Sequence, residues 1–409
     1  MTDSLTIDTT PDDRAFRAEA RDWLEANAEL RRGDGDWSNG PADSSDVAEL
    51  EYFERCRAWQ RTRFDGGWAG ITWPVEFGGR GGTAWESVVF DQEQARFDVT
   101  SGFLASTIGM VGPVLMASGT VEQQARFLRP LLRGDEAWCQ LFSEPDAGSD
   151  LANLSTRAER DGDEFVVNGQ KVWTSNVHRC DWAILLARTS PDAPKHRGIT
   201  FFLLDLRTPG VDIRPLRQIT GTAHFNEVFL GDVRIPARNV VGGVDRGWEP
   251  ARRVLGHEAV VIGGAHTADG TDALIDLARS VDQVDRPPVR QRLARAYSDE
   301  RVLDHMRNRV LQSVRDGGAP ALDGSLLKIF WSEARAERAN AAVDLLGPAG
   351  ALYGSDSPEG GRWQVQLLNR FWGTIGGGTS EVHRTMIGER VLGLPPEPRV
   401  DRDVPWSTT

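Results

Sequence analysis

Cysteine is scarce in this sequence, and basic residues are outnumbered by acidic ones. The three cysteines, Cys56, Cys139 and Cys180, form no CxxC pair and no spacing typical of a disulfide framework. We therefore expect a protein of a reducing, cytoplasmic compartment. The formal net charge is −13, from 47 Lys and Arg against 60 Asp and Glu. Binding to nucleic acid or to an anionic membrane is not expected, because both require clustered basic residues.

Long hydrophobic segments are missing as well. No apolar run approaches the roughly 20 residues that a membrane-spanning helix needs. Residues 1–15 carry four aspartates in place of the apolar core of a signal peptide. A G-x-G-x-x-G loop between a strand and a helix is absent, which argues against a Rossmann-type NAD site. Tryptophan, in contrast, is abundant, with 14 residues in 409, and this predicts an interior or interface rich in aromatic side chains.

The first third of the chain predicts helices. Thr10-Pro11-Asp12-Asp13 places an N-cap residue before a proline and two acidic residues, which is typical of a helix start. A second helix is expected from about Ser45 to the paired glycines at 66–67. Thr120-Val121-Glu122-Gln123 has the form of a capping box that opens another helix.

From about residue 139 the hydrophobic pattern changes to the period of strands. Asp161-Gly162 and Asn168-Gly169 are dipeptides typical of hairpin turns, and 181–186 and 199–204 are apolar runs of strand length. Helical spacing returns near 248–279, 289–315 and 325–346, and Thr379 can cap a last helix. We therefore predict an α+β protein with an N-terminal helical domain (1–138), a middle β-sheet or β-barrel domain (139–240) and a C-terminal helical bundle (241–409).

The most specific pattern is a pair of loops rich in hydroxyl and amide groups. Ser143-Glu144-Pro145-Asp146-Ala147-Gly148-Ser149-Asp150 is followed 23 residues later by Trp173-Thr174-Ser175-Asn176. Because predicted hairpins lie between them, both loops should return to one edge of a small sheet. There, backbone N–H groups and hydroxyls can bind a planar, anionic ligand, and the indole can cover its face. Either loop alone would fit an ordinary turn beside a core tryptophan, but the ordered pair argues against that interpretation.

The two loops closely resemble the flavin-binding middle domain of the acyl-CoA dehydrogenase family, which carries (T/S)-E-P-x-x-G-S-D and W-x-(T/S)-N at this spacing. The order of helical, β and helical segments is similar too, and the resemblance covers about residues 10–395. It implies FAD as cofactor and α,β-dehydrogenation of an acyl-CoA thioester to the trans-2-enoyl-CoA. It also implies an electron-transfer flavoprotein as electron acceptor and assembly as a homo-oligomer, a dimer or tetramer.

Site residues follow from positions that match the family's motifs. The segment Ile375 to Ser380 resembles the family's I-Y-E-G-T-S turn, where glycines let the backbone approach a pyrophosphate at a helix N-terminus. The resemblance implies flavin contacts at Leu141, Phe142, Ser143, Ser149, Trp173, Thr174, Ser175, Thr379 and Glu381. It implies acyl-CoA contacts at Ser149, His257, Glu258 and Gly378.

The catalytic base is not where common members of the family place it. That position is Gly377 here. Glu258 instead falls where a minority branch, including isovaleryl- and long-chain-type enzymes, carries its glutamate. Apolar residues flank it at 254–255 and 260–262, and apolar surroundings raise the pKa of a carboxylate and make it a stronger base. We therefore expect Glu258 to be the base; a surface glutamate is the alternative. A zinc site at His257-Glu258 is not expected, because no second histidine follows at the required spacing.

Several positions depart from the family's pattern. Ala259 stands where an arginine usually follows the helix glutamate, the R-x-F-G segment is missing between Val281 and Arg292, and 344–348 reads DLLGP instead of Q-x-x-G-G. These differences leave open how the adenosine half of FAD is held. Similar chains occur among actinobacterial-type dehydrogenases of branched or bulky acyl-CoAs, and the space left by three glycines at 376–378 favours such a substrate. Two alternatives stay open: a non-catalytic subunit of a heteromeric dehydrogenase, and an oxygen-using flavin oxidase of the same fold.

Overall fold

The computed structural model describes residues 10–33, 37–41, 45–263, 270–316, 321–398 and 403–408. The chain forms two compact units. The first contains Met1–Arg217, Thr222–Val254 and Arg399–Thr409; the second contains Gln218–Gly221 and Leu255–Pro398. The predicted order of helical, β and helical segments is confirmed, whereas the division into three domains at 138 and 240 stays a prediction. None of the described helices combines the length and apolarity that a membrane crossing requires.

The described residues at the start of the first unit form five α-helices, and several of their starts are encoded by short local patterns. The Thr10 side chain caps the first helix with Asp13 as its reciprocal partner, and Thr120 does so with Gln123. Both predicted starts are thereby confirmed. Ser45 caps the second helix and Gly66 ends it, also as predicted. The helices are α1 (Pro11–Asn27), α2 (Asp46–Asp65), α3 (Ala84–Gln94), α4 (Phe103–Ser118) and α5 (Val121–Arg133).

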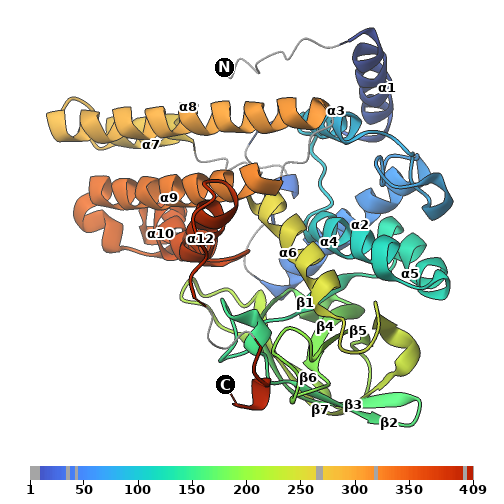
Figure 1. The fold of residues 1–409 in the computed structure, drawn as a ribbon. Helices are drawn as coiled ribbons and strands as arrows, with labels where there is room; N and C mark the ends of the chain where they lie inside the picture. Colours follow the sequence, from blue (N-terminus) through green and yellow to red (C-terminus); the bar gives the residue numbers. More distant parts are fainter. Residues whose placement is uncertain are drawn as a thin grey trace. The chain divides into compact units, whose positions relative to one another are not determined.

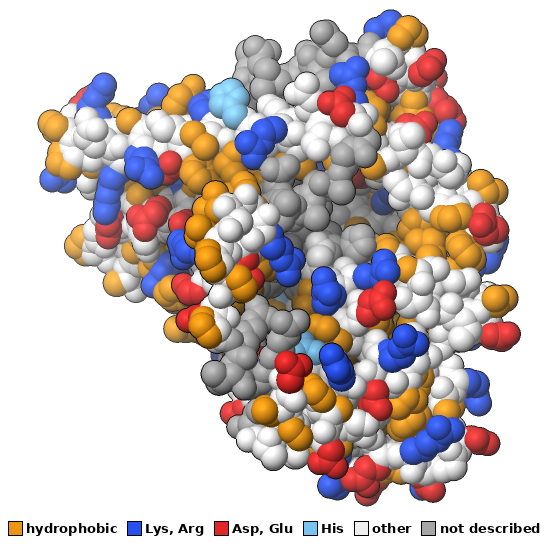
Figure 2. All heavy atoms as spheres, viewed as in Figure 1, with side chains coloured by type: hydrophobic (Ala, Val, Ile, Leu, Met, Phe, Trp, Pro, Cys, Tyr) orange, Lys and Arg blue, Asp and Glu red, His pale blue; other side chains and the backbone are white. Residues whose placement is uncertain are grey.

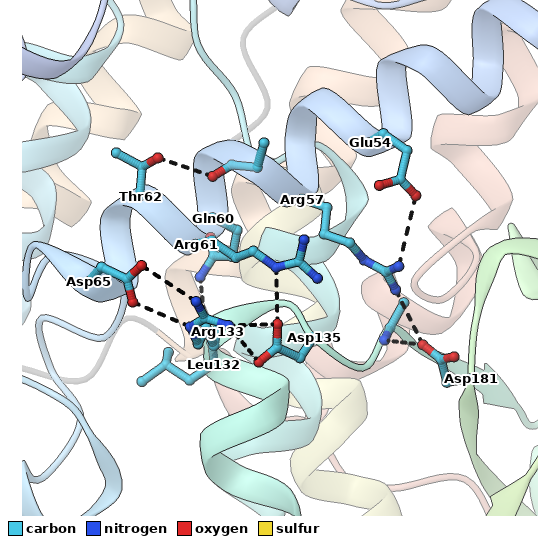
Figure 3. A network of polar contacts seen from close by, with 12 residues as sticks. Glu54, Arg57, Gln60, Arg61, Thr62, Asp65, Leu132, Arg133, Asp135 and Asp181 are labelled. Atoms are coloured by element: carbon cyan, nitrogen blue, oxygen red, sulfur yellow. Dashed lines mark hydrogen bonds and ion pairs between the residues drawn. The ribbon is translucent and has the colours of Figure 1, made fainter.

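Aromatic packing and polar contacts fix these helices. Trp68 stacks on Phe90 with ring centroids 5.0 Å apart, and both rings are buried, which agrees with the expected aromatic interior. Figure 3 shows the polar contacts that tie α2 to its neighbours. Arg57 Nη2 lies 3.2 Å from Asp181 Oδ2, which also accepts the Ala137 N–H. Asp181 therefore anchors the start of two strands to α2.

The middle of the chain forms one eight-stranded sheet (Figure 1). Its order is β6-β7-β3-β2-β4-β5-β8, and β1 pairs in parallel with β4. The apolar runs at 181–186 and 199–204 become β4 and β5, whose residues are almost all buried. The strands are β1 (Trp138–Leu141), β2 (Arg157–Asp161), β3 (Glu164–Ser175), β4 (Trp182–Arg188), β5 (Ile199–Asp205), β6 (Val211–Leu216), β7 (Phe225–Pro236) and β8 (Val240–Val241).

One predicted hairpin is confirmed and the other is wrong. Asp161 pairs with Glu164, so the turn that begins at Asp161-Gly162 joins β2 to β3. Asn168-Gly169 is not a turn, because β3 continues through it with a shift in register against β7. A Cβ at Gly169 would lie 2.4 Å from Thr156 Oγ1. Glycine is needed here because β3 closely approaches the residue that precedes β2; a glycine inside a strand often marks such an approach or a bulge.

The second unit is helical, and its described helices pack around two buried clusters. Trp363 is fully buried with residues of α7, α8 and α9, and Trp331 anchors a second cluster. The helix predicted over 248–279 is seen as two segments, with 264–269 outside the described residues. The helices are α6 (Trp248–Gly263, which begins in the first unit), α7 (Thr271–Ser280), α8 (Pro287–Arg315), α9 (Ala321–Leu346), α10 (Arg362–Leu368), α11 (Arg370–Ile375) and α12 (Ser380–Arg390).

Charge is distributed without obvious segregation on the visible surface. Figure 2 shows Lys and Arg side chains interspersed with Asp and Glu over the described part of this face. On the described part of this face, mixed charge of this kind forms no continuous basic patch.

Candidate functional site

The structure brings the two motif loops of the first unit together. The loop after β1 turns at Glu144, which exchanges backbone hydrogen bonds with Ala147 (3.0 and 3.1 Å). Its Ser143 carbonyl accepts the N–H of Val172 at 2.9 Å, one residue before Trp173. The 143–150 loop is thus joined by backbone contact to the strand that carries the second motif.

A buried ion pair fixes the same junction. The Lys171 ammonium lies 2.7 Å from Glu144 Oε1 and donates to the Phe142 carbonyl at 3.0 Å. The lysine side chain is completely buried and the glutamate nearly so. Glu144 also accepts hydrogen bonds from the backbone of Ser155 (2.6 Å) and Thr156 (2.9 Å). Each oxygen of the carboxylate is occupied, as a buried charge requires.

The pKa of Glu144 reflects these contacts. Burial by itself would raise the pKa, but the Lys171 ammonium and the donated hydrogen bonds more than offset it, and the pKa falls to about 2. Glu144 is therefore ionised at neutral pH and holds the 143–156 segment against β3. It is a structural anchor of the loop.

Trp173 is held in an unusual backbone conformation. Its φ is 62°, in the left-handed region that bulky residues rarely adopt. The strand register shifts between Lys171 and Thr174, and the indole is 62% exposed with its ring edge-on to Phe225, at 5.9 Å between centroids. A strained backbone that presents a large aromatic surface to solvent is a feature of ligand sites rather than of cores.

The other predicted contacts of this unit fall into two groups. Ser149 and Ser175 are exposed and Ser143 is half-buried, so their hydroxyls are open to a ligand. The side chains of Leu141, Phe142 and Thr174 are buried, so Leu141 and Phe142 can contribute only backbone groups. Thr174 has a buried hydroxyl oxygen without a hydrogen-bond partner in the described structure.

The glycine turn of the second unit is gripped by two buried side chains. Gly377 and Gly378 have φ values of 65° and 99°. Lys328 donates to the Gly378 carbonyl, and His383 Nε2 lies 2.9 Å from the Gly377 carbonyl. A Cβ at Gly378 would lie 3.0 Å from His383 Nε2, so the close packing requires glycine.

The protonation of His383 follows from its partners. Burial lowers the pKa of His383, so the ring is neutral at neutral pH. Since the Gly377 carbonyl can only accept, Nε2 carries the proton, and Nδ1 accepts from the Ser325 hydroxyl at 3.1 Å. A neutral histidine thus fixes the direction of one peptide group in the turn.

The turn leads directly into α12. The Thr379 side chain accepts from Val382 N at 3.2 Å, which confirms its predicted capping role. Ser380, next in the chain, is only 6% exposed, and its hydroxyl has no hydrogen-bond partner in the described structure. Glu381 is exposed. The first turn of α12 therefore offers backbone N–H groups, a free hydroxyl and the positive end of the helix dipole, a combination suited to an anion.

The expected base cannot be placed in the same detail. Glu258 and His257 lie on α6, within Trp248–Gly263, but their side chains are outside the described residues. Their catalytic and substrate-binding roles stay predictions.

Three important residues were missed from the sequence. Lys171 stands two positions before the motif tryptophan, and Lys328 and His383 lie in helices that read as ordinary surface-and-core segments. The available signal was weak. Lys328 lies between apolar residues at 326–327 and 329–330, but Lys171 follows Gln170 and His383 precedes Arg384, so neither of these two stands out in the sequence.

Comparisons with known proteins agree with this geometry. Models of the acyl-CoA dehydrogenase N-terminal, middle and C-terminal domains match residues 10–135, 139–233 and 245–392. The chain is 40% identical over 389 residues to acyl-CoA dehydrogenase IpdE1 of Mycobacterium tuberculosis, covering 93% of this chain and 98% of that protein. It is 32% identical over 404 residues to acyl-CoA dehydrogenase FadE29 of the same organism, covering 97% and 100%.

Solved structures give the same result. The structure titled Tcur3481-Tcur3483 steroid ACAD has a TM-score of 0.77 at 28% identity, covering 95% of this chain and 99% of that one. The ChsE4-ChsE5 complex from Mycobacterium tuberculosis has a TM-score of 0.72 at 31% identity, with the same coverage. The chain belongs to the acyl-CoA dehydrogenase family and is an oxidoreductase of that class.

Proposed function

We propose that this acyl-CoA dehydrogenase binds FAD and converts a bulky acyl-CoA thioester to its trans-2-enoyl-CoA, with an electron-transfer flavoprotein as acceptor. The observation that carries the proposal is the strained, exposed Trp173 beside the Ser143 loop. Strain of this kind persists only where the surroundings impose it, and Lys171–Glu144 and the Val172–Ser143 hydrogen bond supply that constraint. The exposed indole is available to one face of a flat ring system.

The residues present fit a flavin dinucleotide. Ser143, with the backbone at 141–143, offers donors and acceptors for the polar edge of the ring, and Ser175 offers an exposed hydroxyl at the end of β3. In the first unit, the exposed hydroxyl of Ser149 suits a phosphate group. In the second unit, taken by itself, Thr379 and the start of α12 suit an anion, and the Ser380 hydroxyl, which has no partner in the described structure, is a further donor. Bound FAD would supply a hydride acceptor. Glu381 is a contact candidate by position only.

The protein's own part in the reaction is to orient the thioester and remove the α-proton. With glycine at 377, a carboxylate must come from elsewhere, and we assign this role to Glu258 on α6, with His257 and Gly378 beside the substrate. An apolar site raises the pKa of such a carboxylate toward that of an effective base. Trp173 and the surrounding loops would exclude water from the reacting atoms.

For the acyl group we propose a bulky, steroid-type chain. The similar structure at a TM-score of 0.77 is titled a steroid ACAD, and in this chain Gly376–Gly378 carry no side chains in the turn. The direct test is to purify the protein, record its flavin spectrum, and follow bleaching with straight, branched and steroid-type acyl-CoAs. Bleaching by straight chains alone would refute the bulky substrate, and peroxide release in air would indicate an oxidase.

A second candidate is a non-catalytic subunit that acts only with a partner chain. It is favoured by Gly377 and by the similarity to a protein solved as the ChsE4-ChsE5 complex. Protein expressed alone that binds no FAD, and gains a flavin spectrum only with a second dehydrogenase chain, would support this candidate over a homo-oligomer.

A further inference from the structure

The end of the chain folds back onto the β domain of the first unit. Residues 403–408 are drawn beside the green segment of that domain (Figure 1). Pro405 forms an antiparallel bridge with Pro194, and Trp406 N donates to the Ala193 carbonyl at 3.0 Å. Ser407 N donates to the Pro191 carbonyl at 3.0 Å. The tail therefore extends the backbone edge of the loop between β4 and β5, in a region beyond the 245–392 match to the family's C-terminal model.

Trp406 closes a cluster around a buried arginine. Its ring centroid lies 4.6 Å from the Arg188 guanidinium carbon. Arg188 is only 2% exposed, and its two terminal nitrogens donate to the carbonyls of Lys195 (2.6 Å), Ala152 (2.6 Å) and Leu154 (3.2 Å). A desolvated guanidinium is attracted strongly to an aromatic face, so the indole stabilises the cation that clamps these carbonyls.

The same cluster holds the segment that follows Ser149. Trp406 Nε1 donates to Asn153 Oδ1 at 2.9 Å, and Lys195 Nζ lies 3.0 Å from Asp150 Oδ2. Together with the Arg188 contacts to Ala152 and Leu154, these bonds fix residues 150–154 at four points. Ser149 itself is exposed. It directly precedes the anchored residues 150–154.

We propose that the C-terminal segment Asp403–Thr408 is a strap that positions the Ser149–Leu154 turn for ligand phosphate, with Trp406 as the positioning residue. This inference rests on the proposed function, in which Ser149 contacts the phosphates of FAD and acyl-CoA. The strap acts through the turn and not on the reacting atoms. It should therefore control binding of the ligands and leave the chemical step unchanged.

The test compares Trp406→Ala with two matched variants. Trp406→Phe keeps an aromatic face over Arg188 but loses the N–H to Asn153, and Val404→Ala changes an exposed tail residue. We expect Trp406→Ala to raise the FAD Kd and the acyl-CoA KM at least about fivefold, with kcat within about twofold. Trp406→Phe should fall between Trp406→Ala and wild type, and Val404→Ala should match wild type.

Hydrogen exchange in the FAD-free protein provides a readout that does not depend on ligand. Trp406→Ala should exchange faster at 149–154 and 188–198 while the N-terminal helices keep wild-type protection. Unchanged exchange would overturn the strap. Faster exchange with unchanged Kd and KM would show that the tail only stabilises a loop, and would overturn the positioning role. Wild-type protein that binds no FAD would instead refute the proposed function. The exchange experiment needs no ligand and would still test the strap, so the two failures can be told apart.

A chain ending at Pro398 offers a second route. If the strap positions the turn, adding a synthetic peptide with the sequence of residues 399–409 should restore FAD affinity to the truncated protein. The same peptide with alanine for tryptophan should not restore it. Equal affinity with and without either peptide, at the wild-type value, would also overturn the proposal.

Discussion

The Ser143–Trp173 region and the glycine turn at 376–378 are held in place by different kinds of contact. The Ser143–Trp173 region places a bulky side chain in a left-handed backbone conformation and fixes it with a buried ion pair. The glycine turn at 376–378 has no side chains, and its carbonyls are held by Lys328 and His383. The first region thus exposes a large side chain, and the second has its backbone carbonyls bound by buried side chains. A base is missing from the second region because a turn built on backbone groups has no carboxylate to offer.

The largest effect should come from Glu258, the residue that we propose as the base. Glu258→Gln keeps the size of the side chain but removes the basic carboxylate, and we expect flavin reduction by acyl-CoA to slow by about 10²–10⁴. Stopped-flow bleaching measures this rate, with FAD binding as the control, since it should be unchanged. Reduction at the wild-type rate would show that Glu258 is not the base.

A double variant then tests whether the glycine turn could carry the base. Glu258→Gly with Gly377→Glu should recover part of the activity. Recovery should be incomplete, because the φ of 65° at Gly377 strains any residue with a side chain. Full loss in the double variant, together with wild-type FAD affinity, would indicate that the turn cannot direct a side chain at the substrate.

The second largest effect should follow from breaking the buried ion pair. Lys171→Met leaves the Glu144 carboxylate buried without its cation, and removal of one partner of a buried pair costs about 3–5 kcal/mol. Urea unfolding measures the change. Lys171→Met with Glu144→Gln should lose less stability than Lys171→Met alone, because no uncompensated charge remains. As a control, Arg279→Ala breaks an exposed pair with Asp276 and should cost at most about 1 kcal/mol.

This ion pair also shows what the sequence could and could not predict. The two motif loops were predicted to meet, and Ser143 does contact the backbone beside Trp173. Glu144 was predicted only as part of the motif loop, with no partner. Its contact with Lys171 depends on how the 143–150 loop packs against β3, which the sequence does not show. The prediction of a turn at Asn168-Gly169 was wrong for a related reason. Gly169 packs against Thr156, which directly precedes β2, and this contact is not visible in the sequence.

The contacts of the chain end were beyond sequence reasoning altogether. Trp406 bonds to Asn153 across 253 positions, and a lone tryptophan near a terminus carries no periodic signal. Helix starts, in contrast, were predicted correctly. The caps at Thr10, Thr120 and Thr379 depend on residues three positions away and are confirmed. Prediction failed where the deciding partner was distant in the chain.

Acid should destabilise the first unit through the same carboxylate. The pKa of Glu144 is lowered from 4.5 to about 2 in the folded protein, so its contribution is complete above about pH 4.5 and is lost as the pH falls toward 2. The shift corresponds to on the order of 3 kcal/mol. Glu93 contributes to stability over the same pH range. Burial by itself would raise its pKa, but hydrogen bonds from Arg21, Arg17 and Arg96 lower the pKa to about 2.

Unfolding free energies measured from pH 7 to pH 2.5 test this dependence. Glu144→Gln should be less stable at pH 7 and should lose less stability on acidification than wild type. Parallel curves for the two proteins would show that Glu144 does not titrate with a lowered pKa.

The smallest effect separates backbone strain from side-chain function at Trp173. Because the indole is 62% exposed, its removal costs little burial, whereas the φ of 62° disfavours alanine relative to glycine by about 1 kcal/mol. Trp173→Gly should therefore be up to about 1 kcal/mol more stable than Trp173→Ala. The greater conformational entropy of glycine in the unfolded chain reduces this difference. Both variants should bind FAD more weakly than wild type by flavin fluorescence titration, since both lack the ring. Equal stability of the two variants would mean that the left-handed conformation is not strained, and wild-type FAD affinity in both would remove Trp173 from the flavin site.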